Sequence, residues 1–265
     1  MDHAPRALIA GLGLIGGSIG MALRERGWRV TYVDPHVDLR DAQRAGAADE
    51  RAESIDRDAD ILIVATPVDV AIRLLGARHS AFTTSVASVM SPLKQAANSD
   101  RFVAGHPLAG SHERGLAAAR RDLLGGCSWF LERHEEIVDR VARDCAARIE
   151  IVGAEEHDAA VALTSHLPQM LSTALAAYLG ERRAARGERD LTAFAGPGLQ
   201  TFLRLASSDA SVWSPVLQSN RENLLPHVDA IMSIVRQILE GEREPFADAN
   251  AFMTRLLAAR RPPLA

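Results

Sequence analysis

The first 150 residues alternate short apolar runs with stretches of helical spacing. The strand candidates are the apolar runs 7–10 and 61–65, the β-branched run 29–34 that closes on an acid, and the segments 83–87 and 102–105. Apolar residues at consecutive rather than alternate positions predict strands of a parallel sheet that is covered on both faces. The stretches from Ile15 to Gly27 and over 38–45 have the spacing of helices. This part of the chain is therefore predicted to be an α/β domain built on a parallel sheet.

The pattern changes near residue 154. Beyond it, strand-like runs give way to Ala- and Leu-rich stretches with helical spacing over 157–179, 190–206, 211–240 and 246–259. Pro168 and Pro226 are expected to begin or kink helices rather than lie in their middles, because proline lacks the N–H group that a helix interior uses. We expect an α/β domain over 1–154 and an all-α domain over 155–265, with the ligand in a cleft between them.

The composition is that of a globular protein. The chain has 265 residues, 47% of them hydrophobic, and its 30 basic and 34 acidic side chains give a net charge of −4. These values exclude a disordered chain and a nucleic-acid-binding protein held by bulk positive charge. Cys127 and Cys145 are too few for a disulfide framework or a cysteine-rich metal site. Without a signal-peptide pattern or an apolar run of about 18 residues, we expect a soluble, cytoplasmic protein with no membrane span.

A glycine-rich turn joins the first predicted strand to the first predicted helix. Its sequence, Gly11-Leu12-Gly13-Leu14-Ile15-Gly16, matches Gly-x-Gly-x-x-Gly. In such a turn Gly11 makes the tight bend, Gly13 lets a pyrophosphate approach the backbone, and Gly16 permits close packing of helix on strand. The start of the helix, at Leu14 and Ile15, would offer N–H groups to the phosphates. This context predicts a Rossmann-type dinucleotide-binding domain rather than a purely structural turn.

An acidic residue, Asp34, closes the second predicted strand 18 residues after Gly16. A carboxylate there can accept hydrogen bonds from the hydroxyl groups of the adenosine ribose, and its charge would repel a 2′-phosphate. The cofactor is therefore predicted to be NAD rather than NADP. Thr66 and Pro67 follow the strand 61–65 and are candidates for contact with the nicotinamide side of the cofactor. The alternative is that these two residues form a plain turn.

Among nine histidines, His106 is the candidate for catalysis. It lies in Gly105-His106-Pro107-Leu108-Ala109-Gly110, at the end of a predicted strand, on the sheet edge where the nicotinamide should lie. A histidine there can take a proton from a hydroxyl group whose carbon gives up a hydride, because its ordinary pKa of ~6.5 suits that transfer. The alternative is a histidine that caps a buried turn.

Three segments resemble the prephenate/arogenate dehydrogenases of tyrosine biosynthesis. They are 105–110, Ser165-His166-Leu167-Pro168, and the stretch from Arg204 to Trp213. The resemblance runs from the glycine motif to about Asn220. It implies oxidative decarboxylation of prephenate to 4-hydroxyphenylpyruvate, in which hydride passes from ring C4 to NAD and CO₂ leaves C1. It also implies a homodimer formed through the helical domain.

The resemblance also implies roles for individual residues. His106 would accept a hydrogen bond from the C4 hydroxyl group, and Ser88 would bridge this hydroxyl and the nicotinamide. Arg204 would hold the ring carboxylate, a task suited to a guanidinium group. The other implied substrate contacts are Ser111, Ser165, Gln169 and Trp213, of which the tryptophan can reach a neighbouring subunit's site. Taken alone, Arg204 is better explained as an ion-pair partner and Trp213 as a core residue.

The chain departs from the family at several polar positions. Gln169 replaces a histidine of many members, and its neutral amide favours prephenate over arogenate, whose ammonium group an acid would suit. Met90 and Ser85 stand where a lysine and an aspartate are frequent. The substrate therefore stays open between prephenate, arogenate and 4-amino-4-deoxyprephenate, in which an amine replaces the C4 hydroxyl.

Other functional classes fit less well. A 3-hydroxyacid dehydrogenase or imine reductase shares the two-domain plan but usually needs a lysine or aspartate near the helical domain, and the only lysine, Lys94, lies in the first domain. An NAD-binding sensor without turnover has no need of both His106 and Arg204. The histidines lack metal-ligand spacing, so no metal site is predicted.

Overall fold

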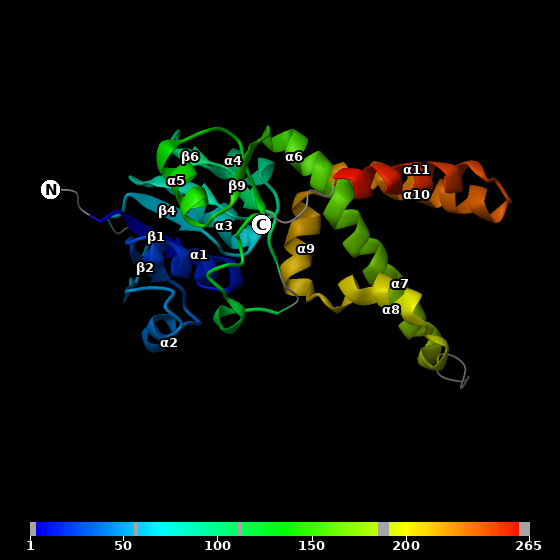
Figure 1. The fold of residues 1–265 in the computed structure, drawn as a ribbon, viewed down its shortest axis with the longest axis horizontal. Coiled ribbons are helices and arrows are strands. Elements are labelled where there is room, and N and C mark those ends of the chain that lie inside the picture. The colour runs from blue at the N-terminus through cyan, green and yellow to red at the C-terminus, as the bar shows by residue number, and fades with distance from the viewer. Residues whose placement is uncertain (1–3, 56–57, 111–112, 185–190, 260–265) are drawn as a thin grey trace.

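The computed structural model describes residues 4–55, 58–110, 113–184 and 191–259 (Figure 1). A six-stranded parallel sheet with the order β3-β2-β1-β4-β5-β6 forms the centre of the first part of the chain. Its strands are β1 Arg6–Ala10, β2 Arg29–Val33, β3 Glu50–Arg51, β4 Ile61–Val64, β5 Phe82–Ser85 and β6 Phe102–Val103. The predicted α/β fold with a Rossmann-type parallel sheet is confirmed.

Helices cover both faces of this sheet, which explains why its central strands β1 and β4 are apolar at consecutive positions. Ile61 and Ile63 of β4 pack in one core together with side chains of α1 and α5. Leu62 and Val64 of the same strand pack in the opposite core with side chains of α3 and α4. The helices are α1 Leu14–Glu25, α2 Leu39–Arg44, α3 Val68–Leu75, α4 Ser91–Ala96 and α5 Glu136–Asp144.

A second, three-stranded sheet follows the first one. It contains β7 Gly105–Pro107, β8 Ser128–Leu131 and β9 Arg148–Ile151, with β7 antiparallel to β8 and β8 parallel to β9. The apolar run 102–105 is thus divided between two sheets at Ala104, and β8 and β9 were not predicted. A 3₁₀ turn, Leu116–Ala118, lies in the long connection between β7 and β8.

The described residues after Ile151 form only helices and turns. These elements are α6 Ala154–Val161, a π-helical turn Ala162–His166, α7 Leu167–Ala184, a 3₁₀ turn Leu191–Phe194, α8 Pro197–Leu203, a 3₁₀ turn Arg204–Ser207, α9 Ala210–Ser219, α10 Arg221–Leu239 and α11 Glu244–Ala259. Figure 1 shows α7 with α8, and α10 with α11, as two arms that extend away from the sheets. Pro168 is the second residue of α7, as expected, and Pro226 is the sixth residue of α10, where its missing N–H group removes one helical hydrogen bond.

The helical part meets the sheet part through α6 and α9. The helix α6 contacts α4, and α9 contacts α3. Val216 of α9 and Ala154 of α6 are buried in the same core as β4 and α3, and Trp213 packs against that core. In the described part of the chain, no helix has the length and apolar character needed to cross a membrane.

Candidate active site

The glycine-rich turn between β1 and α1 has the shape that a dinucleotide needs. Gly11 has a φ of +89°, and a Cβ atom on it would lie 2.7 Å from the carbonyl oxygen of Ala65. A Cβ atom on Gly16 would lie 2.0 Å from the carbonyl oxygen of Gly11. By contrast, a Cβ atom on Gly13 would meet no heavy atom within 4 Å, so the backbone there is open to a ligand. Leu14 and Ile15 begin α1, whose first turn carries no acidic residue to repel a phosphate.

The carboxylate of Asp34 is fixed beside this turn. Its Oδ2 atom accepts a hydrogen bond from the backbone N–H of Leu12 at 2.8 Å, and its Oδ1 atom accepts one from the N–H of His36 at 2.8 Å. Asp34 is half-buried directly after β2. Each carboxylate oxygen has a further lone pair, so the group can also accept bonds from ribose hydroxyl groups.

The carboxyl ends of β4 and β5 bring two predicted cofactor contacts, Thr66 and Pro67, and the predicted catalytic residue Ser88 to the edge of the sheet where β1 leads into the glycine turn. Thr66, half-buried, and Pro67, exposed, follow β4, and Pro67 precedes α3. Ser88, half-buried, follows β5. This is the edge at which ligands bind in open α/β sheets. The glycine turn, the fixed carboxylate and this edge together fit a dinucleotide.

His106 lies on β7 and is held by a line of buried polar groups. Its Nδ1 atom lies 2.9 Å from Nε2 of His157, and Nδ1 of His157 lies 2.8 Å from Oδ1 of Asp158. Asp158 in turn accepts hydrogen bonds from the backbone N–H groups of Met90 and Ser91, each at 2.8 Å. Neither His157 nor Asp158 was predicted, although an adjacent histidine and aspartate near the start of the helical part offered a signal.

Burial controls the charge of these groups. Burial, followed by the positive charge that His157 and His166 can carry, lowers the pKa of His106 to about 3, while Asp158 acts weakly in the opposite direction. Burial works to raise the pKa of Asp158, but the hydrogen bonds from His157, Met90 and Ser91 outweigh it and hold that pKa below its ordinary value. His106 is therefore a neutral imidazole and Asp158 a carboxylate near pH 7.

A second polar cluster adjoins the first. The side-chain amide of Asn220 donates to the backbone oxygen of Asp158 at 2.8 Å and to Nδ1 of His166 at 3.0 Å. The ring of Trp213 meets His166 edge-on, with 5.9 Å between ring centroids. Ser165 is half-buried in the π-helical turn beside His166. Asn220 thus links Asp158 to His166 and, through the ring of His166, to Trp213, whereas Ser165 adjoins this cluster as the chain neighbour of His166.

Gln169 is buried and uses its amide within the chain. Its Nε2 atom donates to the backbone oxygen of Leu205 at 2.8 Å and to Oγ1 of Thr173 at 3.1 Å, and its Oε1 atom accepts from Oγ of Ser208 at 3.4 Å. These bonds hold the turn that carries Arg204, whose side chain is exposed. Ser111, predicted to contact substrate, lies outside the described residues.

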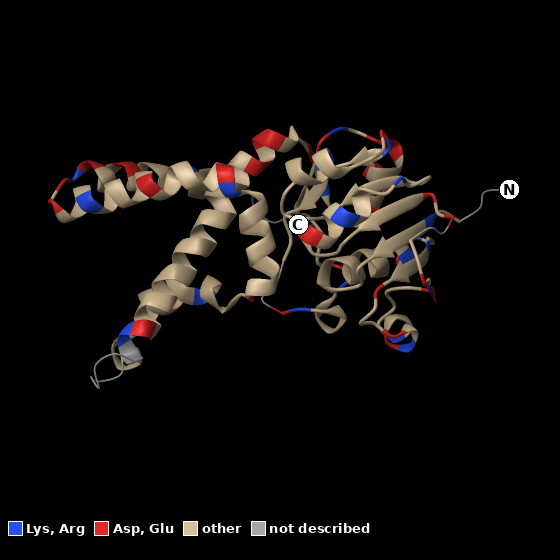
Figure 2. Cartoon of the chain, turned by 180° about the vertical axis from the view of Figure 1, so that it is seen from behind, with Lys and Arg blue, Asp and Glu red and all other residues tan. Residues whose placement is uncertain are grey.

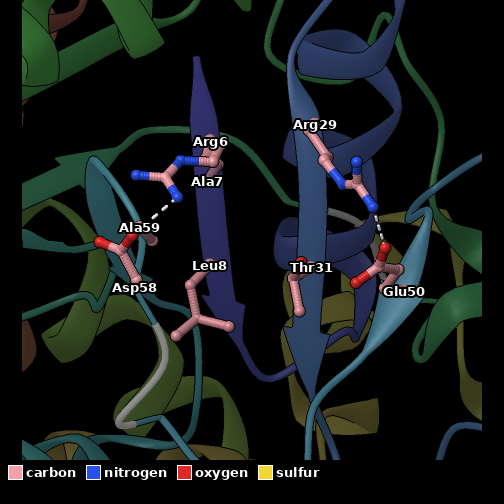
Figure 3. A pocket seen from close by; sticks show the side chains of 8 residues that line it. All are labelled: Arg6, Ala7, Leu8, Arg29, Thr31, Glu50, Asp58 and Ala59. Atoms are coloured by element: carbon pink, nitrogen blue, oxygen red, sulfur yellow. Dashed lines mark hydrogen bonds and ion pairs between the residues drawn. The ribbon is translucent and has the colours of Figure 1, made fainter. Parts of the chain in front are cut away.

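A hollow at the opposite end of the sheet shows a different character (Figure 3). It measures about 220 Å³ and lies where β1 and β2 begin. Its two arginines are paired with acids, Arg6 with Asp58 at 2.8 Å and Arg29 with Glu50. Because their charges are balanced, this hollow does not resemble an anion site.

Comparison with known proteins identifies the family. Residues 19–153, more than half of the chain, match the family described as "Prephenate dehydrogenase, nucleotide-binding domain", and residues 153–247 match "Prephenate dehydrogenase, dimerization domain". The prephenate dehydrogenase of Lactococcus lactis is 29% identical over 84% of this chain, and that of Bacillus subtilis is 30% identical over 84%. The chain spans about two thirds of the length of these relatives, 67% and 66%.

A solved structure agrees with this assignment. The prephenate dehydrogenase of A. aeolicus, in complex with hydroxyphenyl propionate and NAD⁺, is 25% identical and superposes with a TM-score of 0.82. The match covers 97% of this chain and 99% of that one. The chain therefore belongs to the prephenate dehydrogenase family of oxidoreductases.

Proposed function

We propose that this chain catalyses the NAD-dependent oxidative decarboxylation of prephenate to 4-hydroxyphenylpyruvate. The observation that carries the proposal is the buried, neutral imidazole of His106 on β7. The strand β7 adjoins the end of β5, where Oγ of Ser85 donates to the backbone oxygen of Gly105 at 3.4 Å, and the chain continues from β5 to Ser88. A neutral imidazole can accept the proton of a hydroxyl group. The relatives from L. lactis and B. subtilis carry the name of this activity, and the A. aeolicus enzyme binds a hydroxyphenyl acid together with NAD⁺.

The overall reaction neither releases nor consumes a proton, so the base must return the proton that it takes. Prephenate, with two negative charges, and NAD⁺ give CO₂, NADH and a product with one negative charge. His106 therefore takes the C4 hydroxyl proton as the C4–H bond breaks and returns it to the phenolate oxygen once CO₂ has left. Formation of the aromatic ring drives the step, so the protein has mainly to bind, orient and polarise its substrate.

NAD, when bound, supplies the hydride acceptor. The residues that would hold it are the backbone of the turn from Gly11 to Gly16, Asp34 for the ribose hydroxyl groups, and Thr66 with Pro67 on the nicotinamide side. We favour NAD over NADP because the carboxylate of Asp34 would repel a 2′-phosphate.

The substrate contacts that we propose are those that the family resemblance implies. Ser88 would bridge the C4 hydroxyl and the nicotinamide, and Arg204 would hold the ring carboxylate. The exposed guanidinium of Arg204 forms no ion pair with another described residue, so it is available to an anionic ligand. Ser111, Ser165, Gln169 and Trp213 complete the proposed set of substrate contacts. Gln169 would contact the substrate through the remaining lone pair of its Oε1 atom, or indirectly through the turn Arg204–Ser207, which its side chain holds in place.

We also propose that the chain is a cytoplasmic homodimer, divided at residue 154 into a dinucleotide-binding domain and a helical domain. Figure 2 shows that α7 is uncharged over most of its length. The other arm leaves large apolar side chains exposed, namely Leu225, Met232, Ile234, Val235, Ile238 and Leu239 of α10, and Phe246, Phe252, Met253, Leu256 and Leu257 of α11. Sedimentation at micromolar concentration should give twice the mass of the chain, and a monomer would contradict the proposal.

The test is NADH formation by the purified protein with prephenate and with arogenate, each with NAD⁺ and with NADP⁺. Rapid turnover of prephenate with NAD⁺ supports the proposal. Turnover of arogenate alone, or of 4-amino-4-deoxyprephenate in a further assay, would identify that compound as the substrate and leave the proposed reaction type, hydride transfer with decarboxylation, unchanged. The variant His106→Asn should lose turnover and still bind NAD⁺ in a calorimetric titration. If it no longer binds NAD⁺, the loss of turnover reflects cofactor binding, and the assignment of His106 as the base is rejected.

A further inference from the structure

Three side chains from two parts of the chain form one buried line. His106 comes from β7, and His157 and Asp158 come from α6. Their exposed fractions are 8%, 2% and 1%. In such surroundings hydrogen bonds are electrostatically stronger than in water, and each proton has a defined place.

The place of every proton along this line follows from its acidic end. Both oxygens of Asp158 already accept backbone N–H groups, those of Met90 and Ser91, as a carboxylate does. The Nδ1 atom of His157, 2.8 Å from Oδ1 of Asp158, must then be the donor. A neutral imidazole carries one N–H group, so Nε2 of His157 presents a lone pair.

The same reasoning assigns the proton on the ring of His106. Its Nδ1 atom lies 2.9 Å from the lone pair on Nε2 of His157 and must donate to it. The lone pair of His106 is then on Nε2, which has no hydrogen-bond partner among the described residues. The two rings stand at 88° with centroids 5.1 Å apart, and Phe130 packs edge-on against His157 with 5.4 Å between centroids. These contacts hinder rotation of the His157 ring.

We propose that His157 and Asp158 are positioning residues that hold His106 in the tautomer with Nδ1 protonated and Nε2 free. The proposal rests on the function proposed above, because it assigns the atom that receives the substrate's proton. The C4 O–H bond breaks, an N–H bond forms at Nε2 of His106, and the Nδ1–H bond to His157 stays in place. When the phenolate forms, the Nε2–H bond breaks and the proton returns to oxygen.

Asp158 also supports the charge that His106 gains in this step. The imidazolium is faced by His157 and Asp158 from α6 and by His166 from the π-helical turn. Of these only Asp158 carries a negative charge, and its position is fixed by Met90, Ser91 and, through its backbone oxygen, Asn220. A carboxylate that orients a histidine through the far ring nitrogen follows the logic of a catalytic triad. Here a second imidazole lies between the two groups.

The first experiment needs no substrate. Long-range ¹H–¹⁵N NMR spectra of the protein labelled with ¹⁵N-histidine report which ring nitrogen carries the proton. The His106→Asn variant assigns the resonances of that residue. We expect His106 to show a protonated Nδ1 and an unprotonated Nε2 at pH 7. A protonated Nε2 in the wild-type protein would overturn the proposal, whatever the substrate of the enzyme is.

Two variants of His157 then separate positioning from packing. In His157→Gln, Asp158 accepts from the amide NH₂ group, which turns the amide oxygen towards His106 and preserves its tautomer. In His157→Leu, nothing accepts the Nδ1 proton, and His106 should show a protonated Nε2. We expect kcat to fall on the order of 10²-fold in His157→Leu and much less in His157→Gln, with KM for prephenate and Kd for NAD⁺ little changed. Equal losses of kcat in both variants would overturn the proposal.

A matched control excludes general destabilisation. Asp49 resembles Asp158 because its carboxylate accepts a backbone N–H group, that of Val30 at 2.8 Å, but it lies beside β2 and β3 and pairs with Arg24. Asp49→Asn should leave kcat and the tautomer of His106 unchanged. If His157→Leu fails to fold, the wild-type spectrum and His157→Gln still decide the question. Correct tautomers without turnover of prephenate would reject the proposed function and leave the positioning intact.

Discussion

Acidification from pH 7 to pH 5 should destabilise the fold through two buried histidines. Burial, followed by neighbouring histidine charges, lowers the pKa of His106 to about 3. Burial also lowers the pKa of His166 to about 4, with Asp158 opposing and His157 adding to the shift. Both groups should titrate near ~6.5 in the unfolded chain. Below that pH the unfolded chain binds two protons that the folded chain does not, so stability present above pH ~6.5 is lost as the pH falls toward the folded-state pKa values.

The size of the effect follows from these shifts. Each histidine contributes a slope of about 1.4 kcal/mol per pH unit between the two pKa values. From pH ~6.5 to pH 5 this amounts to about 2 kcal/mol for each histidine, or about 4 kcal/mol for both. Domains are stable by only about 5–15 kcal/mol, so the loss is large. The low pKa of Asp158 adds little in this window, because an unfolded aspartate is also ionised at pH 5.

The assay is urea unfolding at pH 7 and pH 5, with the protein concentration fixed because self-association adds to apparent stability. The wild-type protein should lose about 4 kcal/mol, and His106→Asn, which removes one of the two groups, about 2 kcal/mol. The control His36→Asn alters an exposed histidine and should lose as much as the wild type. A loss in His106→Asn equal to that of the wild type would refute the assignment of buried, neutral His106.

Three further predictions concern the ligand sites. Gly16→Ala should lower both the melting temperature and the affinity for NAD⁺, because its Cβ would lie 2.0 Å from the carbonyl oxygen of Gly11. Gly13→Ala should keep the melting temperature and raise the calorimetric Kd for NAD⁺ at least about tenfold, because only the ligand would meet its Cβ. Asp34→Asn should raise kcat/KM for NADP⁺ relative to NAD⁺, and an unchanged ratio would argue against repulsion of the 2′-phosphate. Arg204→Gln should raise KM for prephenate about 10- to 100-fold with an unchanged melting temperature, as for loss of a charged hydrogen bond at an exposed position.

The sequence by itself determined the nucleotide-binding half of the site. The runs at 7–10 and 61–65 became central parallel strands because consecutive apolar residues can only be buried by layers on both sides, and the β-branched run at 29–34 became the strand beside them. The glycine turn was equally readable, since its bend and its close packing depend on residues a few positions apart. Short strands such as β8 and β9 carry a weaker pattern and were not predicted.

Only the tertiary structure decided how the candidate base is held. His157 lies 51 positions after His106, and the two meet because α6 packs against α4 beside the second sheet. The side-chain amide of Gln169, a proposed substrate contact, also donates hydrogen bonds to Leu205 and Thr173, which no pattern in the sequence indicated. Hydrophobic periodicity reports which face of an element is buried, whereas a hydrogen-bond partner is chosen by the packing of elements far apart in the chain. That is why the dinucleotide turn could be read from the sequence and the line from Asp158 to His106 could not.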